Sequence, residues 1–316
     1  MMLRLVILSV LLNSAASGTL KERNKDSCVD RCGDHVNHNY NCQCNSACVR
    51  HGDCCSDYNS CDGSEAGFTD EEILIVSEQL YSLDTNKATE NEIHLNLQGF
   101  VSNSQTGAKI DYAQQRLFAY VNEEVLFSRP TFAKFIALLN NYNRMTGIAE
   151  EFTVEQLAEQ DMFITEIMKS SIMDKLYQIF RSKKMYNSIT EFEEDLKKMW
   201  FGLYSRANNV LDSSGFEHVF SGEVKRGKVS GFHSWIRFYL AEQSGELNYY
   251  SYNYDGPTVY CLKDDIRAAG LSKYFVFCRC TVKLGKNTMK IQTYTWTKST
   301  YGNGKKYVAS AFPLTP

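Results

Sequence analysis

Two histidines, His218 and His233, lie within one short stretch of the chain, 214–238, whose other residues suit proton transfer on a phosphodiester. An imidazole is the side chain whose unperturbed pKa lies nearest neutrality, so one ring can accept a proton while the other donates one. The segment between the two histidines supplies a carboxylate and three cations: Glu223, Lys225, Arg226 and Lys228. The stretch therefore predicts acid–base chemistry beside a local basic segment. From composition alone, the alternative is a pair of structural histidines.

The elements that precede this stretch are predicted to be mainly helices. A capping box, in which a Thr is followed three residues later by Glu or Gln, opens one helix at Thr69 and another at Thr153. Further apolar-patterned segments are 116–121, 131–142, 173–180 and 189–204. Residues 69–204 are therefore expected to form a helical half, with His94 in a helix-to-loop segment that lacks basic neighbours.

The chain changes character after Gly215, where short aromatic and β-branched runs are separated by Gly and Asn. Such runs are typical of strands joined by turns. The predicted strands are 235–240, 247–254, 273–282, 289–296 and 306–312. The sequence has no alternating β-α-β pattern and no glycine-rich phosphate loop after a strand. The expected fold class is therefore α+β, with a helical N-terminal half and a mainly antiparallel β C-terminal half.

Eight of the 11 cysteines lie close together near the start of the chain: Cys28, Cys32, Cys42, Cys44, Cys48, Cys54, Cys55 and Cys61. So small a module cannot build a sufficient apolar core and depends on disulfides or a metal. The even number, the adjacent pair of cysteines and a preceding secretory signal favour disulfides over zinc. The sequence leaves their connectivity open.

Residues 1–17 are predicted to be a signal peptide, because Arg4 precedes a short apolar run that is followed by small residues. That run is far shorter than the ~20 residues of a membrane span. The mature protein is therefore expected to be secreted and to have no membrane span. Its net charge of −3 over 316 residues means that any site for a polyanion must be a local basic patch.

The cysteine spacing over residues 27–62 resembles the somatomedin B domain, including the segment DCCSDY at 53–58. The resemblance covers the whole module. It implies a compact knot of four disulfides that contacts an extracellular protein partner. A polar, glycine-bearing linker over 63–68 then leads into one larger domain, 69–316.

Residues 69–254 and 279–313 resemble the EndoU family, the poly(U)-specific endoribonucleases. Two motifs carry this resemblance: GFEHVF-x-GE at 215–223 and VSGFH-x-WI at 229–236. The resemblance implies an EndoU-like fold in a monomeric enzyme that cleaves single-stranded RNA at uridines. The 2′-hydroxyl would attack the phosphorus and leave a 2′,3′-cyclic phosphate and a 5′-hydroxyl.

The resemblance also implies roles for individual residues. His233 would be the base that deprotonates the 2′-hydroxyl, and His218 the acid that protonates the leaving oxygen. Glu217 and Glu223 match family positions needed for activity, where they would orient the imidazoles or hold a Mn²⁺ cofactor. The alternative for the two glutamates is a solvated pair of surface carboxylates.

The sequence departs from the family pattern between residues 258 and 277. The family's third catalytic residue is a lysine in a strand motif, Trp-x-Gly-x-x-Lys, that this chain lacks. Lys263 and Lys273 are the nearest lysines, and Lys263 is taken as the candidate; the alternative for each is a solvated surface lysine. Loss of a preorganised cation typically costs ~10²–10³-fold in rate. A catalytically impaired extracellular RNA- or protein-binding relative is therefore the competing hypothesis.

The C-terminal stretch supplies the expected contacts with the base. Ser310 matches a family position whose hydroxyl reads the uracil edge, and Phe312 stands where many members have a tyrosine that stacks on the base. A phenyl ring keeps the stacking face, which base–aromatic contacts chiefly need. A preference for uridine is therefore expected.

Overall fold

The structure is a computed structural model that describes residues 25–28, 31, 36–45, 47–58, 68–102, 105, 110–253, 256–261, 276–285, 287–302 and 304–314. The predicted signal peptide and nearly all of the predicted linker lie outside these residues. So do Lys263 and Lys273, together with Cys32 and Cys61. No helix in the described ranges is both long and apolar enough to cross a membrane.

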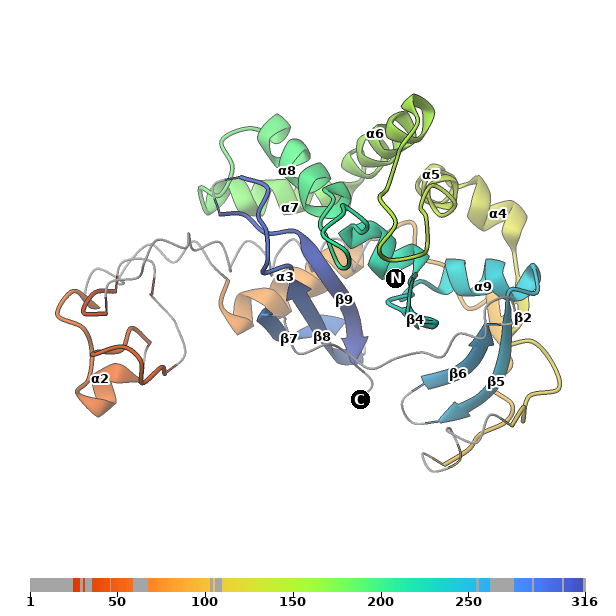
Figure 1. The fold of residues 1–316 in the computed structure, drawn as a ribbon, viewed down its shortest axis with the longest axis horizontal. Helices are drawn as coiled ribbons and strands as arrows, with labels where there is room; N and C mark the ends of the chain where they lie inside the picture. Colours follow the sequence, from red (N-terminus) through yellow and green to blue (C-terminus); the bar gives the residue numbers. More distant parts are fainter. Residues whose placement is uncertain are drawn as a thin grey trace.

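Helices dominate the first part of the large domain, as predicted: α3 (Asp70–Leu83), α4 (Glu123–Ser128), α5 (Pro130–Leu138), α6 (Val154–Met168), α7 (Ser171–Ser182) and α8 (Ile189–Phe201). Both capping boxes are present, so α3 begins after Thr69 and α6 after Thr153, as the sequence indicates. In Figure 1, α4 to α8 lie along the upper side of the domain and the strands lie below them.

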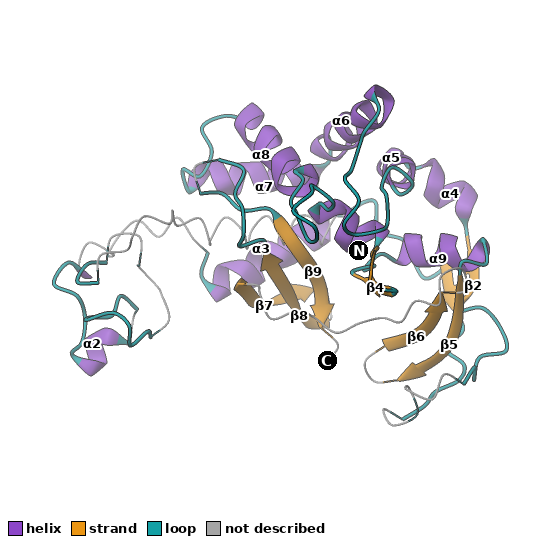
Figure 2. Cartoon of the chain, in the orientation of Figure 1, coloured by secondary structure: helices purple, strands orange, loops and turns teal. Residues whose placement is uncertain are grey.

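The strands pair with antiparallel neighbours in the described residues (Figure 2), and Val224 also forms a single parallel bridge with Met145. Three pairs and one three-stranded sheet are formed: β1 (Ile93–Leu95) with β2 (Phe118–Val121), β3 (Glu223–Lys225) with β4 (Lys228–Ser230), β5 (Leu247–Asn253) with β6 (Gly256–Cys261), and β7 (Val276–Leu284), β8 (Asn287–Thr295) and β9 (Val308–Leu314) in that order. Helix α3 packs against β7. This mixture of helices and antiparallel strands confirms the predicted α+β class.

The prediction of a strand over 235–240 is wrong, because these residues begin helix α9 (Trp235–Gln243). The hydroxyl of Ser234 accepts the amide of Arg237 and caps the helix (3.3 Å). Ile236 and Tyr239 are buried at helical spacing, and the ring of Tyr239 lies 5.3 Å from that of Phe118. The aromatic residues that suggested a strand therefore pack from a helix, whose N-cap outweighs their β propensity.

The helical half also contains strands that were not predicted, β1 and β2. His94 lies exposed on β1, not in a helix-to-loop segment, and its ring packs 5.4 Å from that of Tyr120. The carboxylate of Glu242 on α9 accepts the amides of Leu117 (2.7 Å) and Phe118 (3.2 Å) at the edge of β2. A partner more than a hundred residues away in sequence thus stabilises this strand, and local patterns cannot reveal it.

A cluster of buried aromatic rings anchors the turn that carries His218. The ring of Phe216 lies 5.0 Å from Phe201 and 5.5 Å from Phe135, and that of Phe220 lies 5.4 Å from Trp200. Because Phe216 and Phe220 flank His218 in sequence and are fully buried, the helical core fixes the backbone on both sides of this histidine.

The described part of the cysteine module is held by disulfides, which decides against a zinc site there. Three bridges are described: Cys28–Cys44, Cys42–Cys55 and Cys48–Cys54. The guanidinium of Arg31 is buried among them and donates to the carbonyl of Cys42 (2.7 Å). The cross-links and this buried cation replace an apolar core.

Substitution of Ser234 tests the cap of α9. Ser234→Ala is expected to lower the free energy of unfolding by ~1 kcal/mol, because the amide of Arg237 loses its acceptor. Ser234→Asp keeps an acceptor at the same place and should recover most of that loss. Urea denaturation of the three proteins measures the difference, and equal midpoints for Ala and Asp would contradict the capping role.

Candidate active site

His218 lies on a π-helical turn, η3 (Glu217–Ser221), and not on an α-helix. The amide of Gly222 donates to the carbonyl of Glu217 five residues earlier (2.8 Å), which is the π-helical hydrogen bond. Such a turn shifts the usual pairing by one residue. Carbonyl groups within it are therefore left to accept hydrogen bonds from elsewhere in the chain.

Those carbonyls bind the segment that carries the second histidine. The carbonyl of His218 accepts the amide of Phe232 (3.0 Å), and the carbonyl of Val219 accepts the amide of His233 (2.6 Å). The two histidine motifs that the sequence singles out are thus joined by main-chain hydrogen bonds. Their relative position does not depend on side-chain rotamers.

A tight hairpin, β3–β4, connects the two histidine segments. Its turn residues Arg226 and Gly227 have φ values of 52° and 69°, the left-handed values that a two-residue hairpin turn requires. The register places Glu223 opposite Ser230. The basic segment predicted between the histidines therefore includes this exposed turn, while Glu223 is held at the buried end of the hairpin.

Gly231 allows the two segments to approach so closely. Its φ is 79°, and a Cβ built on it would overlap the carbonyl oxygen of His218. Both the backbone conformation and the contact exclude a side chain here. Any larger residue would push Phe232 and His233 away from the π-turn.

The structure brings the two imidazoles face to edge. The ring centres of His218 and His233 lie 6.4 Å apart, with 67° between the ring planes. His218 is buried, and Nε2 of His233 has no hydrogen-bond partner in the described part of the chain. Two rings at this separation are close enough to serve two oxygens on one phosphorus atom.

A buried ionic chain holds His218. Its Nδ1 lies 3.0 Å from Oε2 of Glu223, and Oε1 of Glu223 lies 3.2 Å from Nε of Arg206. Ser213 also donates its hydroxyl to Glu223. Since the carboxylate accepts a hydrogen bond from Nδ1–H, the second proton of a charged His218 lies on Nε2.

Arg206 ties this chain to the last strand of the sheet. Its guanidinium donates to the hydroxyl of Tyr204 (2.9 Å) and to the carbonyl of Ala309 on β9 (2.6 Å). The loop that presents it is fastened by the buried carboxylate of Asp212, which accepts the main-chain amide of Arg206 (2.6 Å) and that of Gly147 (2.6 Å). One cation therefore fixes both the imidazole and the strand beside it.

The charges in this chain stabilise one another. Burial alone would raise the pKa of Glu223, but the guanidinium of Arg206 and the ring of His218 hold it below its usual range. Burial and Arg206 lower the pKa of His218, whereas the charge of Glu223 opposes them. Burial, with the neighbouring His218, lowers the pKa of His233 to about 3. Without substrate, both imidazoles are therefore neutral near pH 7.

Glu217 differs from Glu223 in charge and in surroundings. It is fully buried, and neither of its carboxyl oxygens has a hydrogen-bond partner among the described residues. Burial raises its pKa to about 10, with contributions from the charges of Glu223 and Glu150. Glu217 is therefore a neutral carboxylic acid, and neither glutamate is the solvated surface carboxylate that the alternative required.

The two glutamates do not fit a shared Mn²⁺ site. A hard divalent ion needs ionised oxygens that no cation already occupies. Both oxygens of Glu223 are engaged, one by the guanidinium of Arg206 and the other by the ring of His218. Within the described ranges, one group of three metal-ligating side chains lies close together, and its sulfurs already form disulfides: Cys28, Cys44 and Cys55.

The two C-terminal candidates lie on β9, on the same face of the strand because they are two residues apart. The ring of Phe312 lies 4.7 Å from that of His233 and 6.0 Å from that of Tyr294. Ser310 is buried, and its hydroxyl has no partner in the residues that the structure describes. A stacking face and an unused hydroxyl thus stand on the strand that borders His233.

The sequence interpretation missed the residues that hold the site together, namely Arg206, Asp212 and Ser213. They precede the first histidine motif, and no catalytic pattern marks them. Their only signal in the sequence is position, because Asp212 and Ser213 lie two to three residues before the motif. Lys263, the candidate cation, lies outside the described residues, so the geometry of the site concerns the remaining groups.

Comparison with known proteins agrees with the motifs. Residues 72–273 match the family model of Endoribonuclease XendoU, and residues 26–64 match that of the somatomedin B domain. The chain belongs to the XendoU endoribonuclease family. This confirms the resemblance that the histidine motifs and the cysteine spacing indicated. The XendoU match extends into the divergent segment that begins at residue 258.

Relatives within the XendoU family are similar over most of their length. A mouse uridylate-specific endoribonuclease is 47% identical over 322 residues, covering 90% of this chain and 77% of the relative. A Xenopus laevis uridylate-specific endoribonuclease C is 48% identical over 79% of this chain and 91% of the relative. Because 322 exceeds the length of this chain, the mouse alignment includes gaps in it.

A solved structure supports the same fold. The structure titled as XendoU, a splicing-independent snoRNA-processing endoribonuclease, is 27% identical and aligns with a TM-score of 0.60. It covers 79% of this chain and 99% of the solved chain. The XendoU architecture therefore extends over the large domain.

Gly231 and Gly227 both have a positive φ, so substituting each by alanine gives a matched test of the close contact between Gly231 and His218. Gly231→Ala should lower the free energy of unfolding by ~2 kcal/mol or more and abolish RNA cleavage, because it adds a steric overlap to a left-handed φ. Gly227→Ala has a left-handed φ without any contact within 4 Å, so it should cost only the backbone strain, about 1 kcal/mol. Urea denaturation compares them, and equal losses would refute the steric role of Gly231.

Proposed function

We propose that this protein is a secreted endoribonuclease that cleaves single-stranded RNA at uridines. The 2′-hydroxyl attacks the adjacent phosphorus, giving a 2′,3′-cyclic phosphate and a 5′-hydroxyl end. The observation that carries the proposal is the pair of imidazoles, His218 and His233, with ring centres 6.4 Å apart. Membership of the XendoU family and the names of the relatives support RNA as the substrate.

In this mechanism His233 acts as the base. Its low pKa keeps the ring neutral, and its buried Nε2, which has no hydrogen-bond partner in the described part of the chain, would take the proton of the 2′-hydroxyl. His218 acts as the acid and gives the proton on Nε2 to the leaving 5′-oxygen. The bound phosphate is an anion, so it raises the pKa of both rings and charges His218 once substrate is present.

Glu223 and Arg206 act through His218. The carboxylate fixes the ring orientation and stabilises its charged form, while the guanidinium keeps the carboxylate ionised. Glu217 contributes a neutral, buried carboxyl at the position before His218. A divalent ion that supports cleavage would have to bind elsewhere, and the phosphate oxygens of RNA offer suitable ligands.

Phe312 and Ser310 are proposed to hold the base. Phe312 offers an aromatic face beside His233, on which uracil can stack. The hydroxyl of Ser310 can both donate to and accept from the uracil edge. Stacking alone tolerates any base, so the hydroxyl would supply the preference for uridine.

The competing function is a binding protein with impaired catalysis. One observation favours it: this chain lacks the lysine motif of the family between residues 258 and 277. The phosphorane carries extra negative charge, which two imidazoles alone neutralise poorly. Activity below that of its relatives would support this reading, with RNA affinity retained.

The extracellular part of the proposal rests on the N-terminal module. A disulfide-linked somatomedin B domain is stable only where thiols stay oxidised. We therefore propose that the protein is a secreted monomer. The small module would bind an extracellular protein partner, independently of the RNA site.

Cleavage of a fluorogenic oligonucleotide with a single uridine, with and without Mn²⁺, tests the enzyme function. His233→Ala should reduce kcat by ~10²–10⁴-fold, the usual contribution of a general base. His94→Ala is the matched control, because that histidine is exposed on β1. Equal cleavage rates in the wild type and in His233→Ala would assign the activity to a contaminant and contradict the proposal.

The dependence of cleavage on pH tests the ionic chain. Glu223 raises the pKa of His218 against burial and Arg206, so Glu223→Gln should lower that pKa further. The acid must be protonated, so activity falls as pH rises through its pKa. The alkaline limb of kcat should therefore move to lower pH by ~1–3 units. An unmoved alkaline limb would contradict the role of Glu223.

Two substitutions of Phe312 test recognition of the base. Phe312→Ala should raise KM by roughly 10-fold or more, since a stacked base contributes ~1–3 kcal/mol. Phe312→Tyr keeps the stacking face and should retain the KM of the wild type. The comparison uses uridine- and cytidine-containing oligonucleotides. An unchanged KM in the alanine variant would remove Phe312 from the base site.

A further inference from the structure

The loop 143–150, between α5 and α6, is closed at both ends by Glu150. The carboxylate of Glu150 accepts the amide of Asn143 (2.9 Å) at the start of the loop. The amide of Glu150 donates to the carbonyl of Leu211 (2.8 Å) at the end of the loop. Because the side chain of Glu150 is buried, water competes little for these hydrogen bonds.

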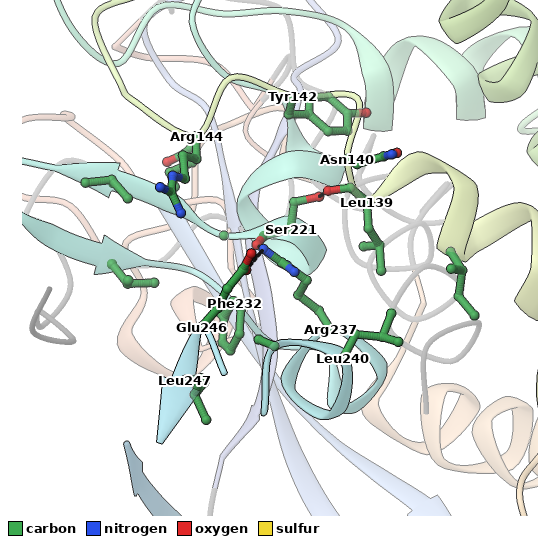
Figure 3. A pocket seen from close by; sticks show the side chains of 16 residues that line it. Leu139, Asn140, Tyr142, Arg144, Ser221, Phe232, Arg237, Leu240, Glu246 and Leu247 are labelled. Atoms are coloured by element: carbon green, nitrogen blue, oxygen red, sulfur yellow. Dashed lines mark hydrogen bonds and ion pairs between the residues drawn. The ribbon is translucent and has the colours of Figure 1, made fainter. Parts of the chain in front are cut away.

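The middle of this loop holds the hairpin next to Glu223. The amide of Thr146 donates to the carbonyl of Val224 (3.0 Å), and the carbonyl of Arg144 accepts the amide of Val224 (2.5 Å). In Figure 3, Arg144 lies beside the strands of the hairpin. Val224 directly follows Glu223 on β3, so the loop sets the position of that carboxylate.

The same loop holds the other partner of the buried ionic contact. The amide of Gly147 donates to Oδ2 of Asp212 (2.6 Å), and Oδ1 of Asp212 accepts the amide of Arg206 (2.6 Å). Two consecutive amides of one loop, those of Thr146 and Gly147, therefore hold the strand of Glu223 and, through Asp212, the main chain of Arg206.

Side-chain packing does not fix the hairpin on every side. A cavity of about 370 Å³ lies between the hairpin and the helices α5 and α9 (Figure 3), and Glu223 lines it. Its lining also includes Val224 and Val229 of the hairpin and Leu240 of α9. A cavity supplies no contacting atoms to its walls, so on this side the hydrogen bonds of the loop position Glu223.

The loop needs an acceptor at Glu150 and not a charge. Burial raises the pKa of Glu150 to about 7, against the hydrogen bond from Asn143. The nearby charges of Glu223 and Asp212 also raise this pKa. The carboxyl group is therefore partly protonated at neutral pH. A protonated carboxyl still accepts through its carbonyl oxygen, so the loop is closed in either state.

We propose that Glu150 is a positioning residue for His218. By closing the 143–150 loop, it holds both partners of the contact between Arg206 and Glu223 that orients the ring. In the described part of the chain Glu150 makes no hydrogen bond to the ring, so it acts through the loop. This role rests on the proposed RNA cleavage, in which His218 is the acid.

Three substitutions of Glu150 separate the acceptor from the charge, with cleavage of the single-uridine oligonucleotide as the measurement. Glu150→Asp keeps the charge but withdraws the acceptor by one methylene group, and Glu150→Ala removes both. Each should lower kcat ~10–10²-fold and leave KM unchanged, because the acid is displaced and no contact with RNA is lost. Glu150→Gln keeps an acceptor without a charge and should recover most of the lost kcat.

Glu191→Ala is the matched control for a general loss of stability. Glu191 also accepts a main-chain amide, that of Asn187 (2.9 Å), at the start of α8. This substitution should lower the urea midpoint and leave kcat unchanged. Equal losses of kcat in Glu150→Ala and Glu191→Ala would overturn the proposal. If Glu150→Ala does not fold, the other pair decides, since retained kcat in Glu150→Asp with lost kcat in Glu150→Gln would overturn it too.

Nuclear magnetic resonance of the Nδ1 proton of His218 gives a readout that does not need cleavage. The hydrogen bond to Glu223 protects this proton from exchange with water, so its signal should be present in the wild type and Glu150→Gln and absent from His218→Ala. The signal should broaden or vanish in Glu150→Asp, and its persistence in the folded Glu150→Asp protein would overturn the proposal. If the signal follows this pattern while the wild type cleaves no RNA, the positioning of His218 is supported and the proposed enzyme function alone fails.

Discussion

The whole site depends on one buried ionic contact, between Arg206 and Glu223. A guanidinium and a carboxylate that lose their water are stable only when each has the other and further hydrogen bonds. Here Arg206 also binds a carbonyl on β9, and Glu223 also binds His218. The contact therefore joins the loop before the first histidine, the hairpin and the final strand. Removing either partner would leave an uncompensated buried charge where these elements meet.

The main-chain arrangement makes this contact possible. The π-turn, the tight hairpin and Gly231 bring Glu223 back to the ring of a histidine only five residues earlier. The aromatic cluster around Phe216 and Phe220 holds the turn on the helical core. Rigid packing thus holds His218 and His233 in position, while the basic turn of the hairpin is exposed at the surface.

Much of the fold could be read from local signals, whereas the supports of the site could not. The capping boxes at Thr69 and Thr153 locate helices because the cap is a contact within four residues. Helix α9 was mistaken for a strand because its aromatic residues have β propensity, and its cap is a single serine. The motifs marked His218 and His233, but Arg206 acts through partners as distant as Ala309, which no local pattern encodes.

The π-turn also has a consequence for insertions and deletions. An α-helix rotates each residue by ~100° about its axis, so a one-residue deletion within Glu217–Ser221 would restore ordinary helical pairing and turn His218 away from Glu223. The extra residue of this turn is what places the two histidine motifs against each other.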